Sequence, residues 1–117
     1  MICDSDENTL QALKEGLTSS EFPVHTLSDA TQVVSKAAAQ PCILIINPDM
    51  KGFNEHDVCK KLKQDKGMPV IFLLDQHSTI RAHFGECEAD DVVTKPFEMD
   101  NLQNLLAKHY TVTSNTK

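Results

Sequence analysis

Hydrophobic residues in this chain follow two spacings, one typical of helices and one typical of buried strands. Leu10, Leu13 and Leu17 recur every three to four residues, which predicts one buried face of a helix. By contrast, residues 42–46 and 70–74 are continuous apolar runs that contain many β-branched side chains. Runs of this kind are typical of strands that are buried on both faces of a parallel sheet. The pattern therefore predicts an α/β protein.

Capping and turn signals divide the chain into five strand–helix units. The expected strands occupy residues 1–3, 24–27, 42–46, 70–74 and 90–94. The expected helices begin after the acidic segment 4–8, after Ser28, and before Val58, and then cover residues 77–86 and 97–110. Residues 111–117 are expected to form a polar tail. This alternation implies right-handed crossovers and a doubly wound, five-stranded parallel sheet with helices on both faces.

Composition narrows the possible partners of this domain. The chain has 117 residues, enough for one hydrophobic core, and its formal charge of -6 disfavours binding to nucleic acid or to an anionic membrane. Its apolar runs are much shorter than the roughly 20 residues of a membrane span. The first ten residues lack the basic region of a secretory signal. We therefore expect a cytoplasmic protein whose four cysteines, which have no C-x-x-C spacing, are plain buried thiols.

Chemistry in a doubly wound sheet gathers at the carboxyl ends of the strands. Those ends carry acidic residues after the first strand, INPDMKGFNEHDVCKKLK after the third, MPVIFLL on the fourth and ADDVVTKPF around the fifth. Together these segments closely resemble the receiver domain of two-component response regulators, over residues 1–110. The Lys-Pro-Phe that follows the short fifth strand is the most specific part of the match. The resemblance implies a flavodoxin-like (βα)5 fold with strand order 2-1-3-4-5, followed by the tail at 111–117.

The resemblance also implies a chemistry that one residue of this chain forbids. In the family, a carboxylate at the end of the third strand accepts a phosphoryl group from a histidine kinase, aided by magnesium, a lysine and a hydroxyl residue. The matching position here is Asn47. A neutral amide has no anionic oxygen to attack phosphorus. We therefore expect a pseudo-receiver, a domain that keeps the fold and lacks the phosphoacceptor aspartate.

Further positions depart from the family pattern. Leu74 matches the hydroxyl residue and Val92 the aromatic residue of the family's switch, so both switch positions are apolar. Asp75 matches the small residue that follows the hydroxyl residue, and we expect its carboxylate to repel a phosphoryl group in the pocket. The family's acidic pair matches Asp4 and Ser5.

The second acid of the usual pair is replaced by Ser5, and the next acid, Asp6, lies one position further along the chain. One carboxylate ligand is therefore missing from its usual place, so magnesium should bind weakly or not at all, and no other cofactor is expected. Acids near the start of a helix are also favoured by the helix dipole, which offers a structural reading of Asp4 and Asp6. The pocket lysine and proline are intact as Lys95 and Pro96, and the resemblance implies a cis peptide bond between them.

The expected function is a protein interaction module of a signalling pathway, without enzymatic activity, since no Ser-His-Asp, P-loop or metalloprotease spacing occurs. Its partner is another signalling protein or another domain of the same natural chain. The family's usual contact face, formed by the fourth helix, fifth strand and fifth helix, is the expected partner or homodimer surface. Two alternatives remain: phosphorylation at another acid, such as Asp49, and a flavodoxin-like small-molecule binder. The acidic loop after the first strand would repel a nucleotide phosphate in the second case.

Overall fold

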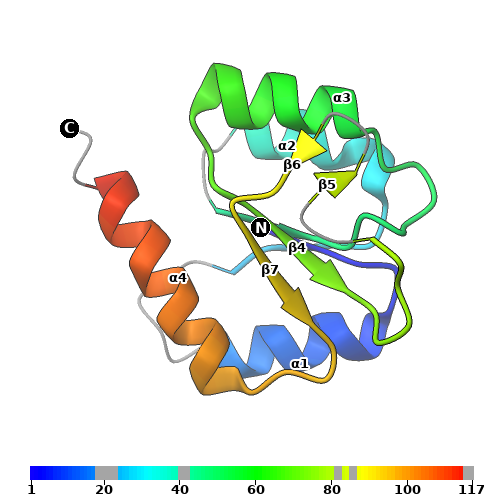
Figure 1. Ribbon diagram of the computed structural model, residues 1–117, viewed down its shortest axis with the longest axis vertical. Helices are drawn as coiled ribbons and strands as arrows, with labels where there is room; N and C mark the ends of the chain where they lie inside the picture. The colour runs from blue at the N-terminus through cyan, green and yellow to red at the C-terminus, as the bar shows by residue number, and fades with distance from the viewer. Residues whose placement is uncertain (18–23, 40–42, 81–82, 85–86, 115–117) are drawn as a thin grey trace.

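The computed structural model describes residues 1–17, 24–39, 43–80, 83–84 and 87–114 of the chain (Figure 1). Its main sheet has five parallel strands in the order β2-β1-β3-β4-β7. These strands are β1 (Ile2–Cys3), β2 (Thr26–Leu27), β3 (Leu44–Ile46), β4 (Val70–Leu74) and β7 (Asp91–Thr94). Counted among themselves, the strands follow the order 2-1-3-4-5, so the expected fold class is confirmed.

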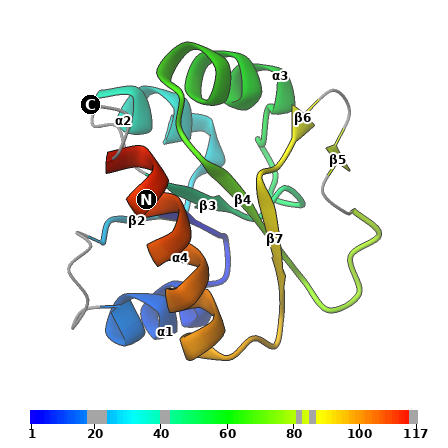
Figure 2. The same cartoon turned by 60° about the vertical axis from the view of Figure 1, so that its left-hand side comes forward.

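Helices cover both faces of this sheet (Figures 1 and 2). One face carries α1 (Glu7–Leu17) and α4 (Met99–Ser114). The other carries the short 3-10 helix η1 (Ala30–Gln32), α2 (Val33–Ala39), and α3 (Glu55–Asp57), which continues as the π-helix η2 (Val58–Gln64). The last helix runs to Ser114, so residues 111–114 continue α4 where the sequence indicated a polar tail.

The central strands explain why the sheet needs helices on both faces. Along β3 and β4 successive side chains alternate between two separate hydrophobic clusters, one on each face. Leu44, Ile46 and Phe72 pack with α2 and η2, whereas Ile45 and Ile71 pack with α1 and α4. All five are at most 2% exposed. Burying an apolar side chain of this size stabilises a fold by roughly 1.5–3 kcal/mol, so the continuous apolar runs fix both the strands and their burial.

The helix expected over residues 77–86 is absent from the part of that segment that the structure describes, residues 77–80 and 83–84, so this prediction is wrong there. The described part of this segment contains a turn, in which Ser78 N donates to Asp75 O at 3.0 Å, and then β5 (His83–Phe84). β5 pairs antiparallel with β6 (Cys87–Glu88). The hydroxyl of Ser78 accepts a hydrogen bond from Ile80 N at 3.1 Å, and such local bonds compete with helix formation.

The cysteines differ from the expectation of four plain thiols. Cys3 is a free, buried thiol whose Sγ lies 3.7 Å from Met50 Sδ. Burial, together with the nearby carboxylates of Asp4 and Asp29, raises the pKa of this thiol to about 12. Cys59, however, takes part in a disulfide bond, so the expectation is wrong for that residue. Cys42 lies outside the described residues.

Within the described ranges, no helix has both the length and the apolar character needed to cross a bilayer.

Leu74 ends β4 with 2% of its surface exposed, in the cluster against which the half-buried Val92 also packs. Replacing Leu74 by Thr removes apolar burial and adds a hydroxyl to an apolar site. We predict that Leu74→Thr lowers the free energy of unfolding by about 1–3 kcal/mol, measured by urea melts. The matched control is Leu27→Thr on β2, a half-buried position where the same substitution should cost less. Equal stability of wild type and Leu74→Thr would contradict the packing argument.

Candidate functional site

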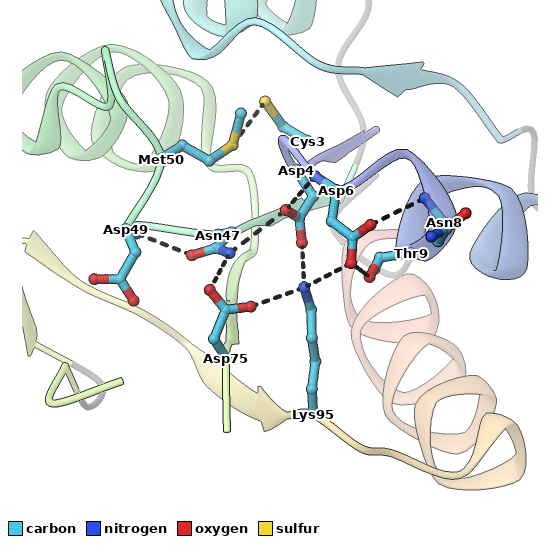
Figure 3. A network of polar contacts seen from close by, with 10 residues as sticks. All are labelled: Cys3, Asp4, Asp6, Asn8, Thr9, Asn47, Asp49, Met50, Asp75 and Lys95. Carbon is cyan, nitrogen blue, oxygen red and sulfur yellow. Dashed lines mark hydrogen bonds and ion pairs between the residues drawn. The ribbon is translucent and has the colours of Figure 1, made fainter. Parts of the chain in front are cut away.

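Four strands of the main sheet are each followed directly by one polar residue of a single cluster. Asp4 follows β1, Asn47 follows β3, Asp75 follows β4 and Lys95 follows β7. Because the strands are parallel and neighbouring, their carboxyl ends meet at one edge of the sheet, and the four side chains converge there (Figure 3). The strands thus create the cluster without any help from a long loop.

Lys95 lies at the centre of this cluster. Its Nζ is 2.9 Å from Asp4 Oδ2, 2.9 Å from Asp75 Oδ1 and 4.0 Å from Asp6 Oδ2. The backbone of Lys95 is fixed by a hydrogen bond from its N–H to Leu74 O at 2.8 Å, and the Lys95–Pro96 bond is cis, which confirms that expectation. Three carboxylates therefore surround one ammonium, and the cluster keeps an overall negative charge.

Asn47 is 3% exposed and is held from both ends of its amide. Its Oδ1 accepts a hydrogen bond from Asp49 N at 2.9 Å. Asn side chains often form this Asx-turn, in which the side-chain oxygen accepts from the backbone N–H two residues further along the chain. Its Nδ2 donates to Asp75 Oδ2 at 3.2 Å and lies 3.5 Å from Asp4 Oδ1. The residue at the end of β3 therefore presents a hydrogen-bond donor to the pocket and no nucleophile.

Asp75 contacts both donors of the site, and the expected repulsion between its carboxylate and a phosphoryl group stays a prediction. Its carboxylate lies between the two donors of the site, Asn47 Nδ2 and Lys95 Nζ. The hydrogen bond from Lys95 lowers the pKa of the Asp75 carboxyl below its ordinary value of 3.8, against an opposing effect of burial. One sequence signal could have revealed this role: Asp75 directly follows a strand, as do the other members of the cluster.

The charged forms of Lys95 and Asp75 stabilise the fold at neutral pH. Burial alone lowers the pKa of Lys95, but its bonds to Asp4 and Asp75 outweigh burial and raise that pKa above its ordinary value of 10.5. A raised lysine pKa gives stability that is present below 10.5 and is lost as the pH rises through the folded-state value. The lowered pKa of Asp75 gives stability that is present above 3.8 and is lost as the pH falls through the folded-state value.

The acidic residues after β1 have different surroundings. Asp4 is 1% exposed and pairs with Lys95, while its Oδ1 accepts from Asp6 N at 3.0 Å. Asp6 accepts from Asn8 N at 3.0 Å and from Thr9 Oγ1 at 2.8 Å at the start of α1, which is the pattern of a helix N-cap. The hydrogen bond from Thr9 lowers the pKa of Asp6. Ser5, which matches the second residue of the acidic pair, is exposed to solvent.

This donor set does not fit a magnesium ion in the arrangement described. A magnesium ion needs several oxygen ligands at short distance. Here the oxygens of Asp4 and Asp75 that face the centre are paired with the Lys95 ammonium, and Asn47 turns its NH2 group toward them. Among the described residues, no group of three His, Cys, Asp or Glu side chains is arranged to hold a metal.

Comparison with known proteins identifies the origin of this geometry. Residues 1–107 match the model of the response regulator receiver domain. The chain belongs to this family. Receiver domains are in general signalling modules without enzymatic activity, and they bind Mg²⁺ weakly at the phosphorylation site. Response regulators act on partner signalling proteins or on other domains of their own chain.

Curated relatives are identical to this receiver domain at about a quarter of the aligned residues. It is 28% identical over 104 residues to the DNA-binding response regulator MtrA of Mycobacterium tuberculosis, which covers 87% of this chain and 46% of the relative. It is 27% identical over 104 residues to the sensory transduction protein BceR of Bacillus subtilis, with 87% and 45% covered. The chain thus spans about half the length of these relatives.

Solved structures agree with the fold. A response regulator receiver domain protein from Clostridium thermocellum aligns with a TM-score of 0.83 at 18% identity, over 99% of this chain and 96% of that one. A CheY-like receiver domain protein from Methanospirillum hungatei aligns with a TM-score of 0.79 at 20% identity, over 98% and 95%. At these identities the likeness supports the fold alone.

Lys95 supplies the cation that compensates the buried Asp4 carboxylate. We predict that Lys95→Met lowers the free energy of unfolding by about 2–4 kcal/mol at pH 7, because it leaves a buried charge without its partner. The control is Lys61→Met, which removes an exposed i,i+4 partner of Asp57 and should change stability by less than about 0.5 kcal/mol. Urea melts of the three proteins measure both effects. Similar losses in the two variants would refute the central role of Lys95.

Magnesium should stabilise the protein very little, because it would have to displace the Lys95 ammonium. With a dissociation constant of about 1 mM or weaker, about 1 mM MgCl2 adds at most about 0.4 kcal/mol. We therefore predict a rise in melting temperature of less than about 2–3 °C relative to NaCl at equal ionic strength. A rise of many degrees would show that the carboxylates rearrange around the metal.

Proposed function

We propose that this receiver domain acts without aspartyl phosphorylation, as a pseudo-receiver that signals through constitutive protein–protein contacts. One observation carries the proposal: the residue at the end of β3 is Asn47, a buried amide that donates a hydrogen bond to Asp75. Aspartyl phosphorylation requires an ionised carboxylate at the attacking atom. Asn47 offers a nitrogen whose hydrogens are already engaged.

The state of Lys95 supports the same proposal. A lysine that stabilises a phosphoryl group must be free to approach its oxygens. Here the ammonium already has two carboxylate oxygens at 2.9 Å. A dianionic phosphoryl group would therefore have to compete with Asp4 and Asp75, in a cluster that is already negative.

The apolar switch positions give the proposed domain one fixed state. Leu74 is buried and Val92 is half-buried, on neighbouring strands and in contact with the same hydrophobic cluster. Neither side chain can hydrogen-bond a phosphoryl oxygen. We propose that these positions hold the carboxyl end of β4 in a single arrangement.

Asp49 is a weak alternative acceptor. Its Oδ2 accepts a hydrogen bond from Ser78 Oγ at 2.6 Å, on the outer side of the loop after β3. Within the described part of the chain, the carboxylates that lie within 4 Å of Lys95 Nζ are those of Asp4, Asp6 and Asp75. Asp49 therefore lacks the cation that would assist phosphoryl transfer. The flavodoxin-like alternative is disfavoured because Asp6, an acid, caps α1 where a phosphate would bind.

The proposed contact surface must differ from the expected one, because the described residues of segment 77–86 form a turn and β5 where a helix was expected. What remains of that face is β7, an edge strand, and the neighbouring α4. A surface hollow of about 490 Å³ lies between them, lined in part by Val92, Val93, Phe97 and Leu105. We propose this hollow as the contact site for a signalling partner, for another domain of the natural chain, or for a second copy in a homodimer.

A cytoplasmic setting remains part of the proposal. Disulfides are rare in cytosolic proteins, so the bond at Cys59 is the observation that counts against it. Counting free thiols in protein purified without reductant, and again after reductant is added, would show whether this bond is present.

Incubation with acetyl phosphate and magnesium should leave the mass of the protein unchanged, because Asn47 provides no nucleophile. Intact-mass spectrometry measures this directly. The same assay on Asn47→Asp should show little phosphorylation, since Leu74, Ser5 and the Asp75 carboxylate remain in place. A stoichiometric gain of one phosphoryl group by the wild type would refute the proposed function, and Asp49→Asn would then test whether Asp49 accepts it.

A further inference from the structure

Asp75 occupies both hydrogen-bond donors of the pocket with one side chain. Its Oδ2 lies 3.2 Å from Asn47 Nδ2 and its Oδ1 lies 2.9 Å from Lys95 Nζ (Figure 3). A single carboxylate therefore bridges the end of β3 to the end of β7. The Asp75 side chain is nevertheless 52% exposed, so it closes the pocket from the solvent side.

The same residue also closes a ring of hydrogen bonds between two loops. Asn47 Nδ2 donates to Asp75 Oδ2, and Ser78 N donates to Asp75 O. Ser78 Oγ donates to Asp49 Oδ2, and Asp49 N donates to Asn47 Oδ1. Two side-chain hydrogen bonds, Asn47 to Asp75 and Ser78 to Asp49, thus join the loop after β3 to the loop after β4.

We propose that Asp75 is a built-in carboxylate ligand of this pocket, which fills the donor pair Asn47–Lys95 and clasps the two loops together. The proposal rests on the proposed function, because it describes how a receiver domain without a phosphoacceptor keeps its pocket occupied. In this view the pocket is a binding site for one carboxylate group, and the chain supplies that group itself.

Charge determines which other ligand the donor pair accepts when Asp75 is removed. Asp4 and Asp6 remain beside Lys95, so a dianion such as phosphate is repelled. A small monoanion with carboxylate geometry, such as formate, carries less charge and matches the two donors. Asp75→Ala should therefore create a formate site that the wild type lacks.

The direct probe of this site is the side-chain NH2 group of Asn47, observed in a ¹H–¹⁵N correlation NMR spectrum. Asp75→Ala should shift both Asn47 NH2 proton signals, whereas Asp65→Ala, which removes an exposed acid on η2's C-terminal side, should leave them in place. About 0.1 M sodium formate should return the signals toward their wild-type positions in Asp75→Ala, whereas 0.1 M sodium chloride, which screens equally, should not. Wild type should not respond to formate.

Two results would overturn the clasp. One is an Asn47 NH2 signal in Asp75→Ala that moves no more than in Asp65→Ala. The other is a formate response of equal size in wild type and Asp75→Ala. If Asp75→Ala fails to fold, Asp75→Asn keeps the side chain's size while removing its charge, and it should shift the same signals without gaining a formate response. Asn47 signals unchanged in Asp75→Asn would equally overturn the proposal.

The acetyl phosphate assay on the same samples separates this inference from the proposed function. If wild type gains a phosphoryl group while Asp75→Ala still shifts the Asn47 signals, the proposed function fails and Asp75 remains a ligand of the pocket. If wild type stays unmodified and the Asn47 signals ignore Asp75, the proposed function stands and the clasp is wrong.

Discussion

The ion pair between Lys95 and Asp4 is the constraint on which the rest of the site depends. Asp4 is fixed at the end of β1 and is 1% exposed, so its charge requires a partner inside the protein. Lys95 reaches it from the end of β7, two strands beyond the central β3, and its ammonium contacts the carboxylates that follow β1 and β4, the two neighbours of β3. The positions of two other side chains follow from this cation. Asp75 contacts the ammonium with Oδ1, and Asn47 donates to Asp75 Oδ2.

The amide at position 47 and the acid at position 75 are linked electrostatically, because a second acid at position 47 would repel the first. A carboxylate at the end of β3 would face Asp4 and Asp75 across a few ångströms, where like charges repel strongly in a partly buried site. The neutral Asn47 removes that repulsion and donates a hydrogen bond to Asp75 instead. The negative charge is thus moved from a buried position to one that is half exposed, where its desolvation costs less.

Much of this architecture is readable from the sequence, and the parts that are not share one cause. The apolar runs at β3 and β4, and the polar residue after each strand, are local features that survive into the structure. The partners of Asp75 are not local in sequence. Whether the Asp75 carboxylate is attracted to its surroundings or repelled by them depends on Lys95, 20 positions away, and on the orientation of the Asn47 amide, which Asp49 N fixes. The helix expected over residues 77–86, which the described part of that segment lacks, had only Ile80 and Phe84 as a helical signal, and two apolar residues four apart do not distinguish a helix from a hairpin.

The proposed pseudo-receiver is poorly suited to act as a switch. A ligand shifts a conformational equilibrium only by the difference in its affinity for the two states. In this receiver domain the donors that would create such a difference are already bound by Asp75, and the neighbouring Leu74 is buried in the core. An incoming anion would gain only the excess of its own interactions over those of Asp75, and it would also have to break the link through Ser78 to Asp49. In the proposed pseudo-receiver, the chain itself therefore holds the loops of the pocket in one arrangement, which is the property required of a surface that partners bind constitutively.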